Sequence, residues 1–245
     1  MPIGTSILFF LFMLSNLFGQ PALQPLKITR LTGDFYIYTT YNTYKGNLIP
    51  ANGMYVVTQK GVLLFDTPWD TTQFQPLVDS IQIKHHQKIV LCIATHSHED
   101  RTGGLAFYRQ ADVQTFTTRQ TDEISRLHGR KRAQYLINKD TTFTIGEYSF
   151  QTYYGGPGHT ADNIVIWFEK QRILYGGCLI KSVEAVDLGN LTDANVREWD
   201  TTLQYIRRKC KSPKYIIPGH DDWTNLQSIK HTMQLIEAYK KKNSR

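Results

Sequence analysis

The chain has 245 residues, and its composition is that of a folded, basic protein. Lysine and arginine number 28 against 21 aspartate and glutamate, a formal net charge of +7, while 41% of the residues are hydrophobic and 12% aromatic. This apolar content excludes intrinsic disorder, and three cysteines are too few for a small disulfide scaffold. The basic runs at 207–211 and 240–242 lack interleaved aromatic residues, so we expect no nucleic-acid partner.

The N-terminal segment has the features of an export signal. Residues 1–26 carry no Asp, Glu, Lys or Arg, and the apolar run at 7–14 is short for a bilayer span of roughly 20 residues. We predict a signal peptide over residues 1–19 and export to the periplasm. The mature chain, 20–245, is expected to be a monomeric single domain that inserts into no membrane.

The hydrophobic pattern of the mature chain predicts a mixed α/β fold. Strands are expected over residues 28–40 and 54–58, and the Asn, Gly and Pro residues between them predict a long functional loop at 41–53. Strands and helices then alternate, as in folds whose helices cover β-sheets. Further strands are predicted at 62–65, 89–93, 113–116, 150–154, 164–168, 173–175 and 215–217, and helices at 71–83, at 103–109, from 118, at 195–209 and from 224.

Five of these strands run directly into polar or glycine-rich segments. In α/β folds, ligand sites lie outside the carboxyl ends of strands, so we expect these five ends to meet. A lone histidine or cysteine is more often structural, but their recurrence at several strand ends favours a metal site. The imidazole, thiolate and carboxylate groups there suit zinc: His96, His98, Asp100, His159, Cys178 and His220.

The three cysteines pose a separate question, because an exported chain meets an oxidising compartment. Their odd number means that at least one thiol is free, intermolecular or bound to a metal. Cys92 lies inside an apolar strand and is expected in the core, whereas Cys210 lies in the basic run 207–211 and is expected at the surface. We therefore expect no disulfide between these two.

The segment His96-Ser-His98-Glu-Asp100 resembles the HxHxD motif of the metallo-β-lactamase superfamily, and the other motifs follow in that family's order. The closest resemblance is to class B β-lactamases of the first subclass. Thioesterases and glyoxalase-II-type hydrolases of the superfamily carry a further His where Arg101 stands and a bridging Asp where Cys178 stands. The resemblance implies an αβ/βα sandwich, two central β-sheets flanked by helices. It implies one zinc held by His96, His98 and His159 and a second held by Asp100, Cys178 and His220.

The activity that this resemblance implies is hydrolysis of the amide bond of β-lactam antibiotics by a zinc-bound hydroxide, conferring resistance to penicillins, cephalosporins and carbapenems. Asp100 would orient the hydroxide and assist proton delivery. Lys181, three residues after Cys178, would pair with the substrate carboxylate. Asn190, twelve residues after Cys178, would lie near the lactam carbonyl, although a turn beside Gly189 is an alternative role.

The resemblance also describes the surroundings of the site. Residues 41–53 would form a flap over the substrate, and Trp69 an apolar wall. Asp66 is expected either to hold the metal loop by hydrogen bonds or to make a strand-end turn, and Arg101 to lie beneath the second zinc without binding it.

Two other classes of function stay open. One is another secreted metallo-hydrolase of this fold, such as a lactonase or thioesterase. The other is a non-catalytic secreted zinc-binding protein. A three-His site leaves a coordination position open for water, and this favours catalysis over a closed structural site.

Overall fold

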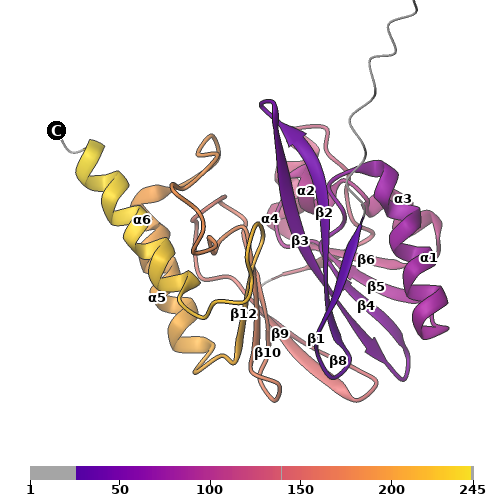
Figure 1. Ribbon diagram of the computed structural model, residues 1–245. Coiled ribbons are helices and arrows are strands. Elements are labelled where there is room, and N and C mark those ends of the chain that lie inside the picture. The colour runs from indigo at the N-terminus through magenta and orange to yellow at the C-terminus, as the bar shows by residue number, and fades with distance from the viewer. Residues whose placement is uncertain (1–25, 139, 244–245) are drawn as a thin grey trace, which may run out of the picture.

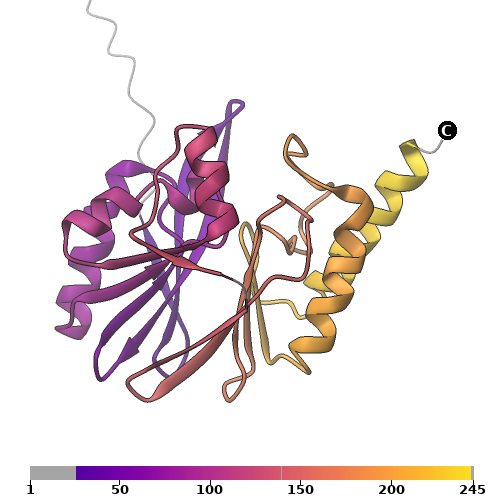
Figure 2. The ribbon, with the colours of Figure 1, turned by 180° about the vertical axis from the view of Figure 1, so that it is seen from behind.

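Two β-sheets pack face to face, and helices cover the outer face of each (Figure 1). The computed structural model describes residues 26–138 and 140–243, so the predicted signal peptide lies outside the described residues. Seen from behind, the same four layers are evident (Figure 2). The predicted sandwich of two central sheets flanked by helices is confirmed.

The first sheet contains seven strands in the order β1-β2-β3-β4-β5-β6-β7. The first four are antiparallel neighbours, and β5 to β7 continue the sheet parallel to β4. Parallel neighbours require crossover segments, and helices supply them here. The strands are β1 (Lys27–Thr32), β2 (Phe35–Tyr44), β3 (Asn47–Thr58), β4 (Gly61–Phe65), β5 (Ile89–Ile93), β6 (Gln114–Thr118) and β7 (Tyr135–Ile137), and the helices are α1 (Phe74–His85), preceded by the 3-10 turn Thr71–Gln73, then α2 (Glu99–Thr102), α3 (Leu105–Gln110) and α4 (Arg119–Leu127).

The second sheet contains five strands in the order β12-β11-β10-β9-β8. Only β11 and β12 are parallel, and α5 crosses between them. The strands are β8 (Thr141–Ile145), β9 (Tyr148–Tyr153), β10 (Val165–Phe168), β11 (Ile173–Gly177) and β12 (Tyr215–Pro218), and the helices on the outer face are α5 (Val196–Lys209) and α6 (Ser228–Asn243). Among the described residues, no helix combines the length and apolarity that a bilayer crossing requires.

The main core lies between the two sheets and joins them. Aromatic rings from opposite sheets meet edge to face there: Phe35 and Phe168 have centroids 4.9 Å apart, and Phe65 and Phe150 5.2 Å apart. All four are buried, and such pairs add roughly 0.5–1.5 kcal/mol each to the burial of their area. Two further apolar layers attach α1 and α3 to the first sheet and α5 and α6 to the second.

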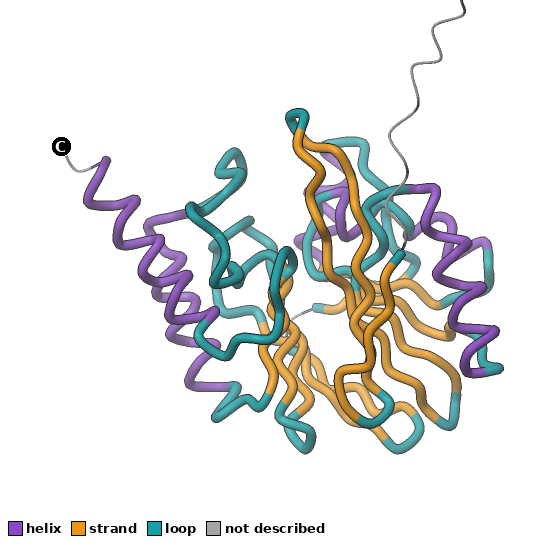
Figure 3. The backbone as a smooth tube through the Cα atoms, viewed as in Figure 1, coloured by secondary structure: helices purple, strands orange, loops and turns teal. Residues whose placement is uncertain are grey.

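The prediction of a loop at 41–53 is wrong, because β2 and β3 form one long hairpin through this segment (Figure 3). Its turn consists of Lys45 and Gly46, whose φ angles of 50° and 79° suit a two-residue turn with positive φ at both positions. Gly53 permits the close packing of the hairpin, since a Cβ there would lie 2.0 Å from the Tyr38 ring. The glycine and proline that indicated a loop are thus accommodated within paired strands.

The prediction that Cys210 lies at the surface is also wrong. Cys210 is 2% exposed and packs in the layer beneath α5 and α6, while Cys92 is in the core as expected. Both are free thiols, as is Cys178. Other differences are smaller: 28–40 divides into β1 and β2 at Gly33, β7 and β8 were not predicted, and the last helix begins at Ser228.

Candidate metal centre and substrate cleft

The five predicted strand ends meet at one edge of the sandwich and open into a cleft of about 1130 Å³. The tip of the β2–β3 hairpin forms one wall, where a flap was expected. The loop 180–193 forms the opposite wall. The candidate ligands that line the cleft are His98, Asp100, His159 and His220.

Three imidazoles converge from both sheets. His96 and His98 follow β5, His159 follows β9, and their ring centroids lie 4.9 to 5.0 Å apart. The Nδ1 atom of His98 is 3.2 Å from the Nε2 atom of His159. Burial lowers the pKa of His96 and of His159 well below the usual value, so both rings are neutral, the form that binds metal.

A second group lies beside the first and comes from three separate segments. The Oδ2 atom of Asp100 is 3.5 Å from the Sγ atom of Cys178 and 3.2 Å from the Nε2 atom of His220, and Sγ and Nε2 are 3.2 Å apart. Gly219 permits this approach, because a Cβ there would lie 2.8 Å from that sulfur. Burial disfavours a proton on His220, but Cys178 and Asp100 raise its pKa to about 9, and a bound cation would displace that proton.

The guanidinium of Arg101 is buried beneath the second group and contacts all three of its members. Its Nη2 atom is 3.0 Å from Asp100 Oδ2, 3.0 Å from Cys178 Sγ and 3.3 Å from His220 Nε2. Burial alone would raise the pKa of Asp100, but Arg101 and His220 hold it well below its usual value. Arg101 thus lies where the sequence analysis expected it, as a fixed positive charge.

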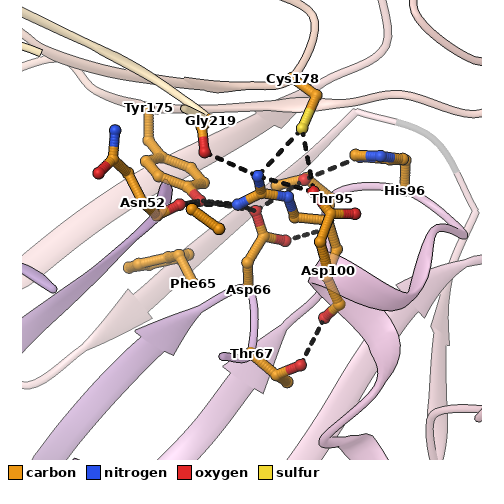
Figure 4. Close-up of polar contacts among 12 residues, drawn as sticks. Asn52, Phe65, Asp66, Thr67, Thr95, His96, Asp100, Tyr175, Cys178 and Gly219 are labelled. Atoms are coloured by element: carbon orange, nitrogen blue, oxygen red, sulfur yellow. Dashed lines mark hydrogen bonds and ion pairs between the residues drawn. The ribbon is translucent and has the colours of Figure 1, made fainter. Parts of the chain in front are cut away.

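Asp66, fully buried, ties the metal loop to this guanidinium. It accepts hydrogen bonds from the Thr95 backbone N–H at 2.7 Å and from the Thr95 hydroxyl at 2.9 Å, and Arg101 Nη1 is 3.4 Å away. The hydroxyl of Tyr175 lies 2.6 Å from the same carboxylate and 2.9 Å from the carbonyl oxygen of Asn52 (Figure 4). The hydrogen-bonding role predicted for Asp66 therefore holds.

Tyr175, Asn52 and Asp193 are residues of the site that sequence reasoning missed. Asp193 Oδ2 accepts a hydrogen bond from His98 Nε2 at 2.7 Å, which directs the Nδ1 atom of His98 toward His159. Tyr175 lies on the strand that ends just before Cys178, and this position was the one sequence feature that could have indicated a role at the site. Asn52 and Asp193 carry no spacing that could have revealed them.

The three predicted substrate contacts all line the cleft. The Lys181 ammonium lies 5.6 Å from the Trp199 ring and has no ion-pair partner among the described residues, and burial lowers its pKa. Asn190 Oδ1 accepts hydrogen bonds from the backbone and hydroxyl of Thr192, so the turn role is present and only its Nδ2 end is available to donate. Trp69 packs 6.2 Å from the Tyr44 ring at the hairpin tip.

The residues present fit a zinc centre. The ligand atoms of His96, His98 and His159 lie within 4.8 Å of one another, as do those of His96, Asp100 and Cys178. The Nε2 atom of His96 is buried and has no hydrogen-bond partner in the described part of the chain, although buried polar atoms are normally paired. Imidazole, thiolate and carboxylate are the ligand types of zinc.

Comparison with known proteins identifies the family of the chain. Residues 46–220 match the metallo-β-lactamase superfamily. The chain belongs to this superfamily. Among metallo-β-lactamases it is similar to metallo-beta-lactamase type 2 of Elizabethkingia meningoseptica, with 42% identity over 227 residues that cover 93% of this chain and 91% of that protein.

Two further metallo-β-lactamases extend the comparison. Metallo-beta-lactamase IND-1 of Chryseobacterium indologenes is 40% identical over 206 residues, which cover 84% of this chain and 86% of that one. The solved structure of a metallo-beta-lactamase from Pontibacter korlensis superimposes with a TM-score of 0.84 at 32% identity and covers 87% of this chain and 99% of that chain. The expected family and fold are confirmed.

Proposed function

We propose that this protein is a zinc-dependent β-lactamase that hydrolyses the amide bond of penicillins, cephalosporins and carbapenems and so confers β-lactam resistance. The observation that carries the proposal is that a three-His site and an Asp-Cys-His group lie side by side at one open cleft. The same cleft holds Lys181, which makes no ion pair with the described residues. Membership of the metallo-β-lactamase superfamily supports the proposal, as does the similarity to proteins that are themselves named metallo-β-lactamases.

The proposed cofactor is two zinc ions per chain. The first would be held by His96, His98 and His159, and the second by Asp100, Cys178 and His220. Zinc in such sites polarises carbonyl groups and lowers the pKa of a bound water to about 7, which provides a nucleophile at neutral pH.

The side chains of the cleft would bind and orient the substrate. Lys181 would pair with its carboxylate, because the ammonium is partly desolvated and makes no ion pair with any of the described residues. The Nδ2 end of Asn190 would donate to the lactam carbonyl oxygen and stabilise the charge that develops there. Trp69 would supply an apolar wall, and ionised Asp100 would orient the attacking water and assist proton delivery to the departing nitrogen.

Specific observations weigh against the two rival functions. Arg101 and Cys178 occupy the positions where thioesterases and glyoxalase-II-type hydrolases of the fold carry His and Asp, and their side chains are in contact. The two residues that distinguish this chain from those hydrolases therefore belong to one buried cluster. A non-catalytic zinc protein would need a closed site, whereas His98, His159 and His220 all line an open cleft.

The deciding experiment measures turnover of a penicillin, a cephalosporin and a carbapenem by the purified protein, before and after a zinc chelator. We expect turnover that the chelator abolishes and added zinc restores. A simple lactone and a thioester are assayed in parallel as substrates of the rival hydrolases. Chelator-sensitive turnover of the lactone or the thioester, together with no turnover of any of the three antibiotics, would contradict the proposal.

We also propose that the protein acts in the periplasm, as a monomer and a single domain, after removal of residues 1–19. The uncharged, apolar N-terminus supports export. N-terminal sequencing of the protein recovered from the periplasmic fraction tests the cleavage, and size-exclusion chromatography with light scattering tests the monomer. An intact N-terminus on the recovered protein would contradict export by cleavage.

A further inference from the structure

The loop after α4 brings an arginine to the rim of the candidate metal centre. Arg130 follows Gly129, whose φ of 64° turns the chain out of the helix, and its backbone N–H donates to the Ser125 carbonyl oxygen at 2.8 Å. The base of this side chain is therefore fixed to the end of α4. Only 19% of the side chain is exposed, and it lines the cleft beside the three-His site.

The two ends of the guanidinium reach two different segments of that site. Nη1 donates to the carbonyl oxygen of Ser97 at 3.2 Å and lies 3.3 Å from its hydroxyl, and Ser97 stands between His96 and His98 in the metal loop. Nη2 is 3.8 Å from Asp193 Oδ2, the oxygen that accepts the hydrogen bond from His98 Nε2. A single arginine thus contacts the loop that carries two histidines and the carboxylate that orients one of them.

We propose that Arg130 is a positioning residue of the three-His site, acting through Ser97 and Asp193 to set its zinc affinity. Asp193 lies on an irregular loop with 35% of its side chain exposed, so its hydrogen bond to His98 needs a second partner to hold it in place. That hydrogen bond keeps the proton on Nε2 and leaves Nδ1 free to bind metal. The inference rests on the metal centre proposed above.

The planar shape of guanidinium suits this role better than a point charge does. It can direct one N–H group at Ser97 while another faces Asp193, whereas a lysine at this position would supply one ammonium for two acceptors. Lysine is therefore expected to preserve part of the effect, through charge alone.

Arg132 provides a matched control in the same loop. It is also ion-paired, donating to Asp122 from Nε at 2.7 Å and from Nη2 at 2.6 Å, but these contacts lie on α4 and involve neither Ser97, His98 nor Asp193. A change at Arg132 removes a charge and an ion pair from the loop and leaves the metal centre untouched.

The test compares zinc affinity, measured by competition with a chromophoric chelator, for the wild-type protein and for Arg130→Gln, Arg130→Lys and Arg132→Gln. We expect Arg130→Gln to weaken the binding of zinc to the three-His site about 10-fold or more, Arg130→Lys to weaken it less, and Arg132→Gln to leave it unchanged. Ligand-field absorption of the cobalt(II)-substituted protein should change in Arg130→Gln, change less in Arg130→Lys and stay as in the wild type in Arg132→Gln.

A double variant tests the route through Asp193. If Arg130 acts through that carboxylate, Arg130→Gln should cost less zinc affinity in an Asp193→Asn background than in the wild type. Equal affinities for Arg130→Gln and wild type, or equal losses in Arg130→Gln and Arg132→Gln, would overturn the proposal. Should Arg130→Gln fail to fold, wild-type affinity in Arg130→Lys together with an unchanged cobalt spectrum would overturn it. Failure of the wild-type protein to bind zinc would instead reject the metal centre itself.

Discussion

The Nη2 atom of Arg101 lies 3.0 Å from the Sγ atom of Cys178. The same nitrogen contacts Asp100, and the neighbouring Nη1 faces Asp66, so one buried cation compensates several acidic groups at once. This arrangement lets a carboxylate and a thiol lie close together in the protein interior. It also makes the site dependent on a residue that is not itself a ligand.

Replacing Arg101 by methionine should destabilise the zinc-free protein by about 3–5 kcal/mol, because buried carboxylates lose their positive partner. Urea unfolding of the zinc-free protein at pH 7 measures this. Arg109→Met, at an exposed position of α3, is the control and should stay within about 0.5 kcal/mol of the wild type. Wild-type stability in Arg101→Met would show that the ion pairs contribute no net stability.

Replacing Cys178 by alanine should reduce the bound zinc from two ions per chain to one. The change removes one of three proposed ligands of the second ion and none of the first. Native mass spectrometry and elemental analysis give the stoichiometry. Cys210→Ala removes an equally buried thiol from the apolar layer beneath α5 and α6 and should keep both ions. Two ions in Cys178→Ala would refute the ligand assignment.

Replacing Lys181 by glutamine should raise KM for a penicillin about 10- to 100-fold while kcat changes much less. A hydrogen bond to a charged group contributes roughly 1.5–3 kcal/mol, and the carboxylate of the substrate is remote from the bond that breaks. Steady-state kinetics measure both constants. Lys211→Gln removes an exposed lysine outside the cleft as the control. A loss confined to kcat would contradict the binding role.

The stability of the zinc-free protein should carry a pH dependence from Asp66. Burial raises the pKa of Asp66 from its ordinary 3.8 to about 6, although Arg101, Tyr175 and Thr95 oppose this. The folded state then binds more protons than the unfolded state between these values, so the contribution of Asp66 to stability falls as pH rises through that interval.

The matched variant for this prediction is Asp66→Asn, because asparagine tolerates the positive φ of 63° at this position and cannot ionise. Between pH 5 and pH 7, the wild type should lose about 1 kcal/mol more stability than Asp66→Asn. Chemical unfolding of both proteins at the two pH values measures the difference. Parallel pH profiles would show that Asp66 is ionised throughout.

The strand ends could be predicted from sequence because short apolar runs break sharply at polar or glycine residues. That pattern located all six candidate ligands and the edge at which they meet. The strand pairing within 41–53 was missed because Gly53 and Pro50 are usual in loops. The packing of the Tyr38 ring against Gly53 explains why a glycine stands in a paired strand there.

The partners of the ligands could not be predicted for a different reason. Asp193 lies 95 residues from His98, and Arg130 lies 33 from Ser97, on segments with no periodicity that could indicate a contact. Cys210 was misplaced because the charges around it dominate the local composition. Its spacing of four from buried Ile206 puts it on the inner face of α5 as that helix ends.

The division of the proposed ligands between the two sheets limits how such a chain can diverge. His96, His98 and Asp100 follow a strand of the first sheet, and His159, Cys178 and His220 follow strands of the second. Each ion would draw ligands from both, so neither half of the gene encodes a complete centre. Insertions in the outer turns alter only the surface of the protein. A substitution that shifts one sheet relative to the other would instead move apart the ligands of both ions. The interface between the halves is therefore expected to be the slowest-changing part of the molecule.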